Sequence, residues 1–382
     1  MKILYTNFHA GAGQGGHTTY ISRLAERLAG RHTVAVAVPA TSTLYRKAGN
    51  IPGVIAYPQQ FPTRLYQMPN ALRTMREVLR KHHFDVVHVN GSADHRLVAL
   101  ASLFLRNRPR IVMTKHNDIA MSFFGASVRA RLGTDHVIAV CNHVAGRLAD
   151  SPYRRVGVST ILNGVDCQAF RPLPQSEAAA HRHALFQGRA DGRIVIGSNA
   201  GTGDYKGWLD MVRAVSSLPK AVAERLHIAI AGSPLTAAAL AQVRAMGMED
   251  RLSYVGQLDD VRPFLSAIDV GFVLSHRVET ISFACREMMA MGKPVMVSRY
   301  AGLPENIRDS HDGWIVPPQN PSAVATILAS IVADNYDIAA MGAAARHKSV
   351  DEFGIEEFVS KTESVYLRVA AHPYEGQALH GM

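Results

Sequence analysis

Two glutamates, Glu279 and Glu287, stand eight positions apart around a point near Ser282 where a helix is expected to begin. A carboxylate in the loop and a second one two turns along the helix can address different ends of one ligand. The N–H groups at the start of the helix favour an anion such as a diphosphate. Ordinary helix capping is the alternative explanation for glutamates at this place.

Lys206 and a glycine cluster add two further places where a phosphate could bind. Lys206 precedes Gly207, Trp208 and a helical segment, so it places a cation at an expected helix start, where a solvated lysine is the alternative explanation. Near the amino terminus, residues 11–16 follow a strand, precede a helix beginning near His17, and formally match G-x-G-x-x-G. No Asp or Glu occurs between Glu26 and Glu77, where an NAD site would need its ribose-binding acid. An NADP-dependent oxidoreductase therefore stays open as an alternative.

The elements that must position these residues alternate between strands and helices, which is typical of doubly wound α/β domains. Residues 171–191 carry no strand signal and form the expected linker. A helix over about 355–371 follows the second sheet and is expected to cross back to the first domain, and 372–382 is an expected loose tail. The expected strands are 2–7, 33–38, 86–89, 111–114, 137–140, 159–162, 193–198, 227–231, 252–255, 270–274 and 294–297.

Length, hydropathy and cysteine content narrow the class of protein. A chain of 382 residues is long enough for two domains. Its apolar runs are too short to span a bilayer, and its amino terminus lacks the pattern of a signal peptide, so we expect a cytoplasmic protein. Three cysteines without C-x-x-C spacing support neither a disulfide framework nor a structural zinc site.

Positive charge is concentrated in the first part of the chain. Residues 1–170 hold 21 Lys and Arg against 8 Asp and Glu, a net charge of +13. Residues 171–382 have a net charge of −3, so the whole chain carries +10. No nucleic-acid-binding motif is present, so we expect an anionic membrane surface and no nucleic acid as partner. Phe123 and Phe124, followed by Arg129 and Arg131, have the makeup of an interfacial helix. The alternative is that both phenylalanines belong to the core beneath a loop.

The order of several motifs resembles glycosyltransferase family 4. The matching segments are Gly15 to Val34, Phe84 to Val89, Asp135 to Val140, Ile161 to Asp166 with Phe170 to Pro172, and Glu279 to Glu305, and together they span roughly residues 2–350. Within the family, the chain most resembles the glucosyltransferase that begins the outer core of lipopolysaccharide. The resemblance implies an α/β protein with the GT-B architecture, in which two Rossmann-like doubly wound domains face a central cleft. It places the acceptor-binding domain at 1–170 and the nucleotide-sugar-binding domain at 171–354.

The resemblance also implies an activity and a site. A sugar would pass, with retention of configuration, from a nucleotide diphosphate, expected to be UDP, to a lipid-linked or lipopolysaccharide-core acceptor at the inner face of the cytoplasmic membrane. No cofactor and no metal are implied. His116 and Glu279 would act on the donor sugar and Glu287 on the ribose. The remaining donor-binding residues would be Gly15, Gly16, Lys206, Leu258, Thr280, Ile281 and Ser282.

Three positions depart from the family pattern. Ala200 stands where an arginine is usual, Ile281 replaces a common phenylalanine, and Ser282 replaces a common glycine. These departures leave open a catalytically degenerate scaffold protein of the same fold. A sugar-nucleotide epimerase of the same two-domain shape is a further alternative.

Overall fold

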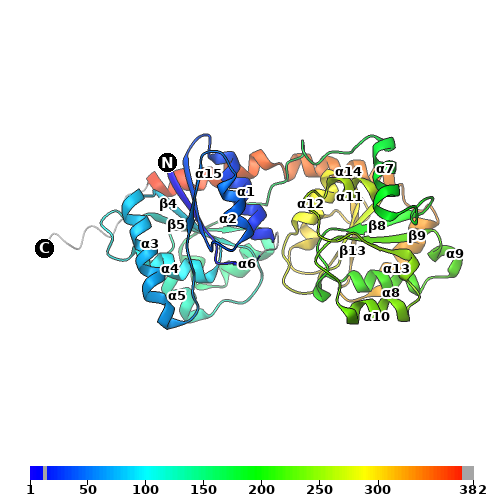
Figure 1. Cartoon of the computed structure of the whole chain (residues 1–382), viewed down its shortest axis with the longest axis horizontal. Coiled ribbons are helices and arrows are strands. Elements are labelled where there is room, and N and C mark those ends of the chain that lie inside the picture. The colour runs from blue at the N-terminus through cyan, green and yellow to red at the C-terminus, as the bar shows by residue number, and fades with distance from the viewer. Residues whose placement is uncertain (12–14, 372–382) are drawn as a thin grey trace. The chain divides into compact units, whose positions relative to one another are not determined.

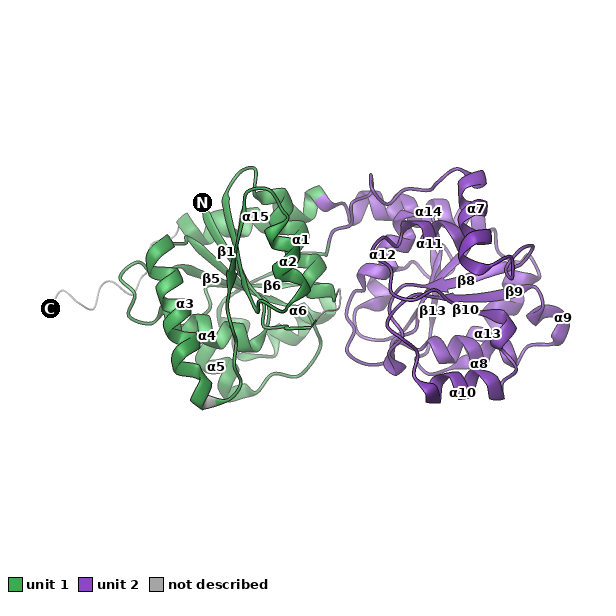
Figure 2. Ribbon diagram, viewed as in Figure 1, with its two compact units in different colours: residues 1–163, 356–382 green, residues 164–355 purple. Residues whose placement is uncertain are grey.

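The computed structural model describes residues 1–11 and 15–371, so part of the glycine cluster and the expected tail lie outside the described residues. The chain forms two compact units (Figure 2): unit 1 comprises Met1–Asn163 and the segment that starts at Glu356, and unit 2 comprises Gly164–Ile355. Residues 164–170 belong to unit 2 because backbone bonds join Val165 to Phe353 and Ile355. The Arg346 guanidinium also donates to the carbonyl groups of Cys167 and Phe170.

Unit 1 is built on a seven-stranded sheet in which all neighbouring strands are parallel. Its order is β3-β2-β1-β4-β5-β6-β7. The strands are β1 (Lys2–Thr6), β2 (Thr33–Val38), β3 (Val54–Pro58), β4 (Val86–Val89), β5 (Arg110–Lys115), β6 (His136–Ala139) and β7 (Gly157–Thr160). The helices are α1 (Gly16–Leu28), α2 (Thr43–Gly49), α3 (Met68–His82), α4 (Ser92–Ser102), α5 (Phe123–Leu132), α6 (Asn142–Ala149) and α15 (Ile355–Ala371), with 3₁₀ turns η1 (Leu65–Gln67) and η2 (Pro152–Arg155).

Unit 2, in which Figure 1 labels β8, β9 and β13, repeats the same plan on six parallel strands. Their order is β10-β9-β8-β11-β12-β13. The strands are β8 (Ile194–Ser198), β9 (Leu226–Ile230), β10 (Leu252–Tyr254), β11 (Val270–Val273), β12 (Val295–Ser298) and β13 (Gly313–Val316). The helices are α7 (Gln175–Phe186), α8 (Trp208–Ser216), α9 (Lys220–Ala223), α10 (Ala237–Ala245), α11 (Arg262–Ala267), α12 (Phe283–Ala290), α13 (Pro321–Val332) and α14 (Ile338–Glu352), with 3₁₀ turns η3 (Asp204–Lys206), η4 (Glu249–Arg251) and η5 (Leu303–Asn306).

Both sheets reverse their strand order beside the first strand of the unit, which is the doubly wound Rossmann arrangement. The α/β fold class predicted from the sequence is confirmed for each unit. Ligands of such sheets bind outside the carboxyl ends of the strands, close to the point of reversal. The loops that follow β1, β4 and β5 in unit 1, and β8 and β11 in unit 2, are therefore where a site is expected.

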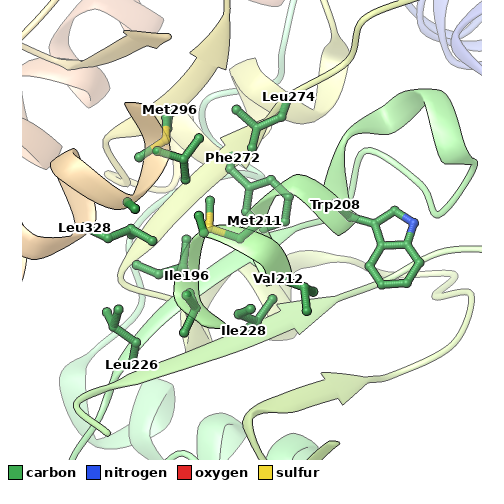
Figure 3. Packing of buried hydrophobic residues seen from close by; sticks show 14 of the residues in the cluster. Ile196, Trp208, Met211, Val212, Leu226, Ile228, Phe272, Leu274, Met296 and Leu328 are labelled. Carbon is green, nitrogen blue, oxygen red and sulfur yellow. The ribbon is translucent and has the colours of Figure 1, made fainter. Parts of the chain in front are cut away.

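The central strands form because they are continuous apolar runs buried on both faces. In unit 2, Ile196, Ile228 and Phe272 of the sheet pack against Met211 and Val212 of α8 (Figure 3). All five side chains are fully buried. Covering helices on both faces hold the strands in register, so the loops at their carboxyl ends start from fixed points.

Each of the eleven expected strands has a counterpart in the structure, whereas β3 and β13 were not predicted. The predicted linker at 171–191 is wrong over most of its length, because it contains α7. This helix ends in the buried Phe186, whose ring meets Phe264 edge-on at 6.3 Å between centroids.

The last helix, α15, packs on unit 1. The Tyr366 hydroxyl donates to the Tyr5 hydroxyl on β1 at 3.1 Å, and Glu363 accepts from His32. Along residues 1–11 and 15–371, no helix combines the length and the apolar character needed to cross a membrane.

Candidate functional site

An ion pair between Lys206 and Glu279 lies at the centre of the site in unit 2. The Lys206 Nζ atom donates to Glu279 Oε2 at 2.7 Å, and the two side chains are only 17% and 12% exposed. Ser275 directs its hydroxyl to the same carboxylate oxygen at 3.4 Å. The structure therefore brings together two residues that are 73 positions apart and that the sequence analysis assigned to the donor.

Gly207 is what allows Lys206 to reach this place. Its φ of +73° is in the left-handed region, and a Cβ atom there would stand 2.1 Å from the carbonyl oxygen of Leu274, at the end of β11. The η3 turn thus lies directly against that strand end, and the His276 N–H donates to the Tyr205 carbonyl across the contact. Only glycine fits both the backbone conformation and the available space.

The loop that carries Glu279 has unusual backbone conformations on both sides of it. Val278 has φ of 51° and Ser282, the N-cap of α12, has φ of 49° with ψ of 109°. Side chains with a Cβ atom rarely adopt this region, and such outliers concentrate at ligand sites. The helix predicted to begin near Ser282 does begin there, at Phe283.

A buried amide that the sequence analysis missed supports this loop from within. Asn306 Nδ2 donates to the Ile281 carbonyl at 2.9 Å, while Asn306 Oδ1 accepts from Arg286 Nε at 2.9 Å. Arg286 is fully buried and lies over the Phe353 ring at 4.0 Å. The two hydrogen bonds of Asn306 join η5 to Ile281 and to α12. They hold the segment Thr280 to Ser282 in place.

Glu287 lies on the first two turns of α12 and is 9% exposed. One of its oxygens accepts from Asn199 Nδ2 at 3.1 Å. Asn199 directly follows β8, so the carboxylate lies at the point where the strand order of the unit reverses. This is the place where doubly wound sheets hold a nucleotide.

The loops after β8, β9 and β10 lie close together. The Trp208 indole N–H donates to the Thr202 carbonyl at 2.9 Å, which anchors the segment that follows Ala200. The Gly232 N–H donates to the Gly256 carbonyl at 2.9 Å, two residues before the partly buried Leu258. The Thr202 hydroxyl also donates to the Ser233 carbonyl at 2.6 Å, so the loop that precedes Lys206 lies beside the loop after β9, which in turn contacts the loop that carries Leu258.

In unit 1, His116 follows β5, and its ring packs against that of His17, which in turn contacts His9. The His116 ring centroid lies 4.2 Å from that of His17 on α1, and His17 lies 4.7 Å from His9. Burial and the neighbouring imidazoles hold the pKa of His116 well below its usual value, and burial lowers the pKa of His17 to about 3. All three rings are therefore neutral bases at neutral pH.

Gly15 and Gly16 begin the same helix as His17. Gly15 is the N-cap of α1 and Gly16 is its first residue, so their backbone lies at the positive end of a 13-residue helix. The predicted anion-binding role of these two residues fits this position. Residues 12–14, the middle of the predicted glycine loop, are outside the described part of the chain.

The proposed membrane residues lie on α5. Phe123 and Phe124 are 76% and 80% exposed, so they are not core residues. Arg131 is exposed, whereas Arg129 Nε donates to the Tyr153 hydroxyl at 3.2 Å and is partly buried. Of the two arginines on this helix, Arg131 is therefore in solvent, whereas Arg129 is held against unit 1.

The comparisons with protein families divide the chain as the fold does. Residues 14–169 match the model of Glycosyltransferase Family 4, and residues 193–334 match that of Glycosyl transferases group 1. Together these matches take in most of both units.

Two curated relatives and one solved structure illustrate the similarity. The chain is 24% identical to the N-acetyl-alpha-D-glucosaminyl L-malate synthase of Bacillus anthracis, over 79% of this chain and 80% of that protein. It is 26% identical to the lipopolysaccharide core biosynthesis glycosyltransferase LpsE of Rhizobium meliloti, over 67% and 75%. The structure of Anabaena HepE in complex with UDP-glucose superposes with a TM-score of 0.82 at 19% identity, over 96% of this chain and 100% of that one.

Proposed function

We propose that this chain, which belongs to glycosyltransferase family 4 and has the GT-B architecture, transfers a sugar from a UDP-sugar to a lipid-linked or lipopolysaccharide-core acceptor with retention of configuration. That it is a glycosyltransferase acting on a nucleotide sugar follows from its family. The observation that carries the proposed use of the site is the Lys206–Glu279 pair at the start of α12.

The diphosphate is the leaving group, so its charge must be stabilised as the glycosidic bond breaks. Lys206 supplies a cation, and the backbone N–H groups of Ile281 and Ser282 supply oriented dipoles at the positive end of α12. The Thr280 N–H, which donates to Glu279 Oε1 at 3.2 Å, joins them when that carboxylate moves to the sugar. In the structure, the Glu279 carboxylate balances the charge of Lys206, with its Oε2 atom 2.7 Å from the lysine Nζ atom. An arriving diphosphate competes for that lysine and frees the carboxylate to accept hydrogen bonds from hydroxyls of the sugar.

Glu287 suits the other end of the donor. The Glu287 carboxylate, in the second turn of α12, is oriented by its hydrogen bond from Asn199 and can accept hydrogen bonds from both hydroxyls of a ribose. We assign His116 of unit 1, a neutral imidazole, to a hydrogen bond with a hydroxyl of the donor sugar. The leaving phosphate itself takes the acceptor proton in front-face attack, so retention requires no protein nucleophile.

The choice of UDP and of an envelope acceptor rests on similarity. The HepE structures hold UDP or UDP-glucose, and LpsE is named for lipopolysaccharide core synthesis. A second relative is a GDP-mannose-dependent mannosyltransferase acting on a phosphatidylinositol mannoside, so the nucleotide must be tested directly.

Calorimetry with UDP-glucose, UDP-galactose, UDP-N-acetylglucosamine and GDP-mannose tests the proposal. Lys206→Ala and Glu287→Ala each remove a charge-assisted contact worth about 1.5 to 3 kcal/mol, so donor affinity should fall roughly ten- to a hundredfold. Lys220→Ala is the matched control, because it removes a lysine of unit 2 that is 87% exposed and pairs only loosely with Glu224. Unchanged binding of the preferred donor by both site variants would refute the assignment.

We also propose that unit 1 places the enzyme on the anionic inner face of the cytoplasmic membrane. Phe123 and Phe124 present apolar side chains at the first turn of α5, and Arg131 adds a cation that attracts acidic headgroups by about 1 kcal/mol. The net charge of +13 over residues 1–170 supports the same orientation toward an anionic surface.

A further inference from the structure

We propose that Asn90 is a positioning residue that fixes the tautomer of His116, with the ring proton on Nε2 and Nδ1 as the accepting nitrogen. The inference rests on the proposed function for the role of His116, but the tautomer can be measured without any substrate.

The orientation of the Asn90 amide is determined by groups that can only accept. Its Nδ2 atom donates to the carbonyl oxygens of Thr6 at 3.0 Å and His88 at 3.2 Å. A flipped amide would place its oxygen against both carbonyls and lose two hydrogen bonds. The amide oxygen must therefore be the atom that lies 2.8 Å from His116 Nε2.

The position of Asn90 is held by a buried carboxylate. Its backbone N–H donates to Asp94 Oδ2 at 2.7 Å, and the same oxygen accepts from the Thr6 hydroxyl at 2.9 Å. Asn90 and Asp94 are 1% and 0% exposed. The amide is consequently fixed by β1, β4 and the start of α4 together.

An amide oxygen cannot donate, so His116 Nε2 must carry the hydrogen of their shared bond. Because His116 is neutral, its one ring hydrogen is the one that Nε2 donates to Asn90, and Nδ1 is the nitrogen that accepts. The ring can accept a hydrogen bond from a hydroxyl, but it cannot donate one to a sugar oxygen. This constraint selects a donor or acceptor hydroxyl that itself donates.

Other titratable groups around the ring keep it neutral. Asp94 acts on the ring indirectly through Asn90, and burial raises the pKa of Asp94 to about 7. Burial is the main cause of the lowered His116 pKa, and neighbouring bases contribute. The neighbouring bases are His9 and His17 from the β1–α1 region, His88 from β4, and Lys115 at the end of β5. The Tyr20 ring of α1 meets the His116 ring edge-on at 4.6 Å between centroids.

Nitrogen NMR of the substrate-free protein tests the tautomer directly. Spectra of ¹⁵N-histidine-labelled protein, with the His116 signals assigned by their loss in His116→Gln, should show the proton on Nε2. A mixture of tautomers should appear in Asn90→Ala. Gln59→Ala is the matched control, since Gln59 is a buried amide that also donates to two carbonyl groups, those of Gln60 and Ala71, away from His116. Wild-type protein with the proton on Nδ1 would overturn the proposal, as would an unchanged tautomer in Asn90→Ala.

The pH profile of turnover supplies a second readout. Turnover requires neutral His116, so it is lost as pH falls through the pKa of that residue. The Asn90 amide oxygen accepts more strongly from a charged ring than from a neutral one, so Asn90→Ala should lower the pKa of His116 and move the acid limb to lower pH. The Kd for UDP should change less than twofold, because His116 does not hold the nucleotide. If no UDP-sugar is turned over at all, the proposed function fails while the NMR result still decides the role of Asn90.

Discussion

Replacing Ser282 with glycine should stabilise unit 2. Ser282 has φ of 49° and ψ of 109°, and its side chain makes no capping hydrogen bond to α12. A residue with a Cβ atom in so sparsely populated a region costs about 1 to 3 kcal/mol. Glycine removes that cost but adds about 0.5 to 1 kcal/mol of conformational entropy to the unfolded chain. With the low ends of the two ranges paired and the high ends paired, the net gain is about 0.5 to 2 kcal/mol.

For a unit of this size, each kcal/mol shifts Tm by about 2 to 4 °C. Scanning calorimetry of Ser282→Gly should therefore show the transition of unit 2 about 1 to 8 °C higher than in wild type. Ser282→Ala is the matched control, because it removes the hydroxyl and keeps the Cβ atom, and its Tm should stay close to that of wild type. An equal rise in both variants, or a fall in Ser282→Gly, would show that the backbone at this N-cap is not strained.

Further predictions concern each unit separately. Gly207→Ala should weaken donor binding at least tenfold and lower the Tm of unit 2, because its Cβ would meet the end of β11; normal donor affinity in a calorimeter would contradict this. His116→Ala and Glu279→Ala should reduce kcat far more than they weaken the binding of free UDP, since both act on the sugar; the reverse pattern would contradict their placement. Phe123→Ser combined with Phe124→Ser should reduce co-sedimentation with vesicles containing phosphatidylglycerol severalfold, and equal binding of wild type to neutral vesicles would exclude the anionic surface as the partner.

The sequence was sufficient for the fold because the central strands are short apolar runs separated by helices. The two strands it missed, β3 and β13, both lie at sheet edges. Ile55 of β3 is 45% exposed and the strand ends at Pro58, so no continuous apolar run marks it. The helix α7 was missed because only Phe186 at its end is buried.

The site was predicted to the extent that its residues belong to local motifs. Lys206 and Glu279 each stand in a recognisable segment, and the structure adds that they touch. Asn306 and Asn90 act through hydrogen bonds to residues far away in the chain, among them Ile281, 25 positions from Asn306, and His116, 26 positions from Asn90. Nothing in their local sequence distinguishes such an asparagine from a solvated one, so three-dimensional contacts were needed to find them.

The Trp208 indole, which holds the loop before Lys206, has a consequence for spectroscopy. The chain has two tryptophans, Trp208 and Trp314, and both are buried in unit 2. Tryptophan emission is therefore an optical signal from one half of the protein alone. Changes in it on adding a nucleotide report the surroundings of the η3 turn, while the melting of unit 1 must be followed through its tyrosines or by circular dichroism.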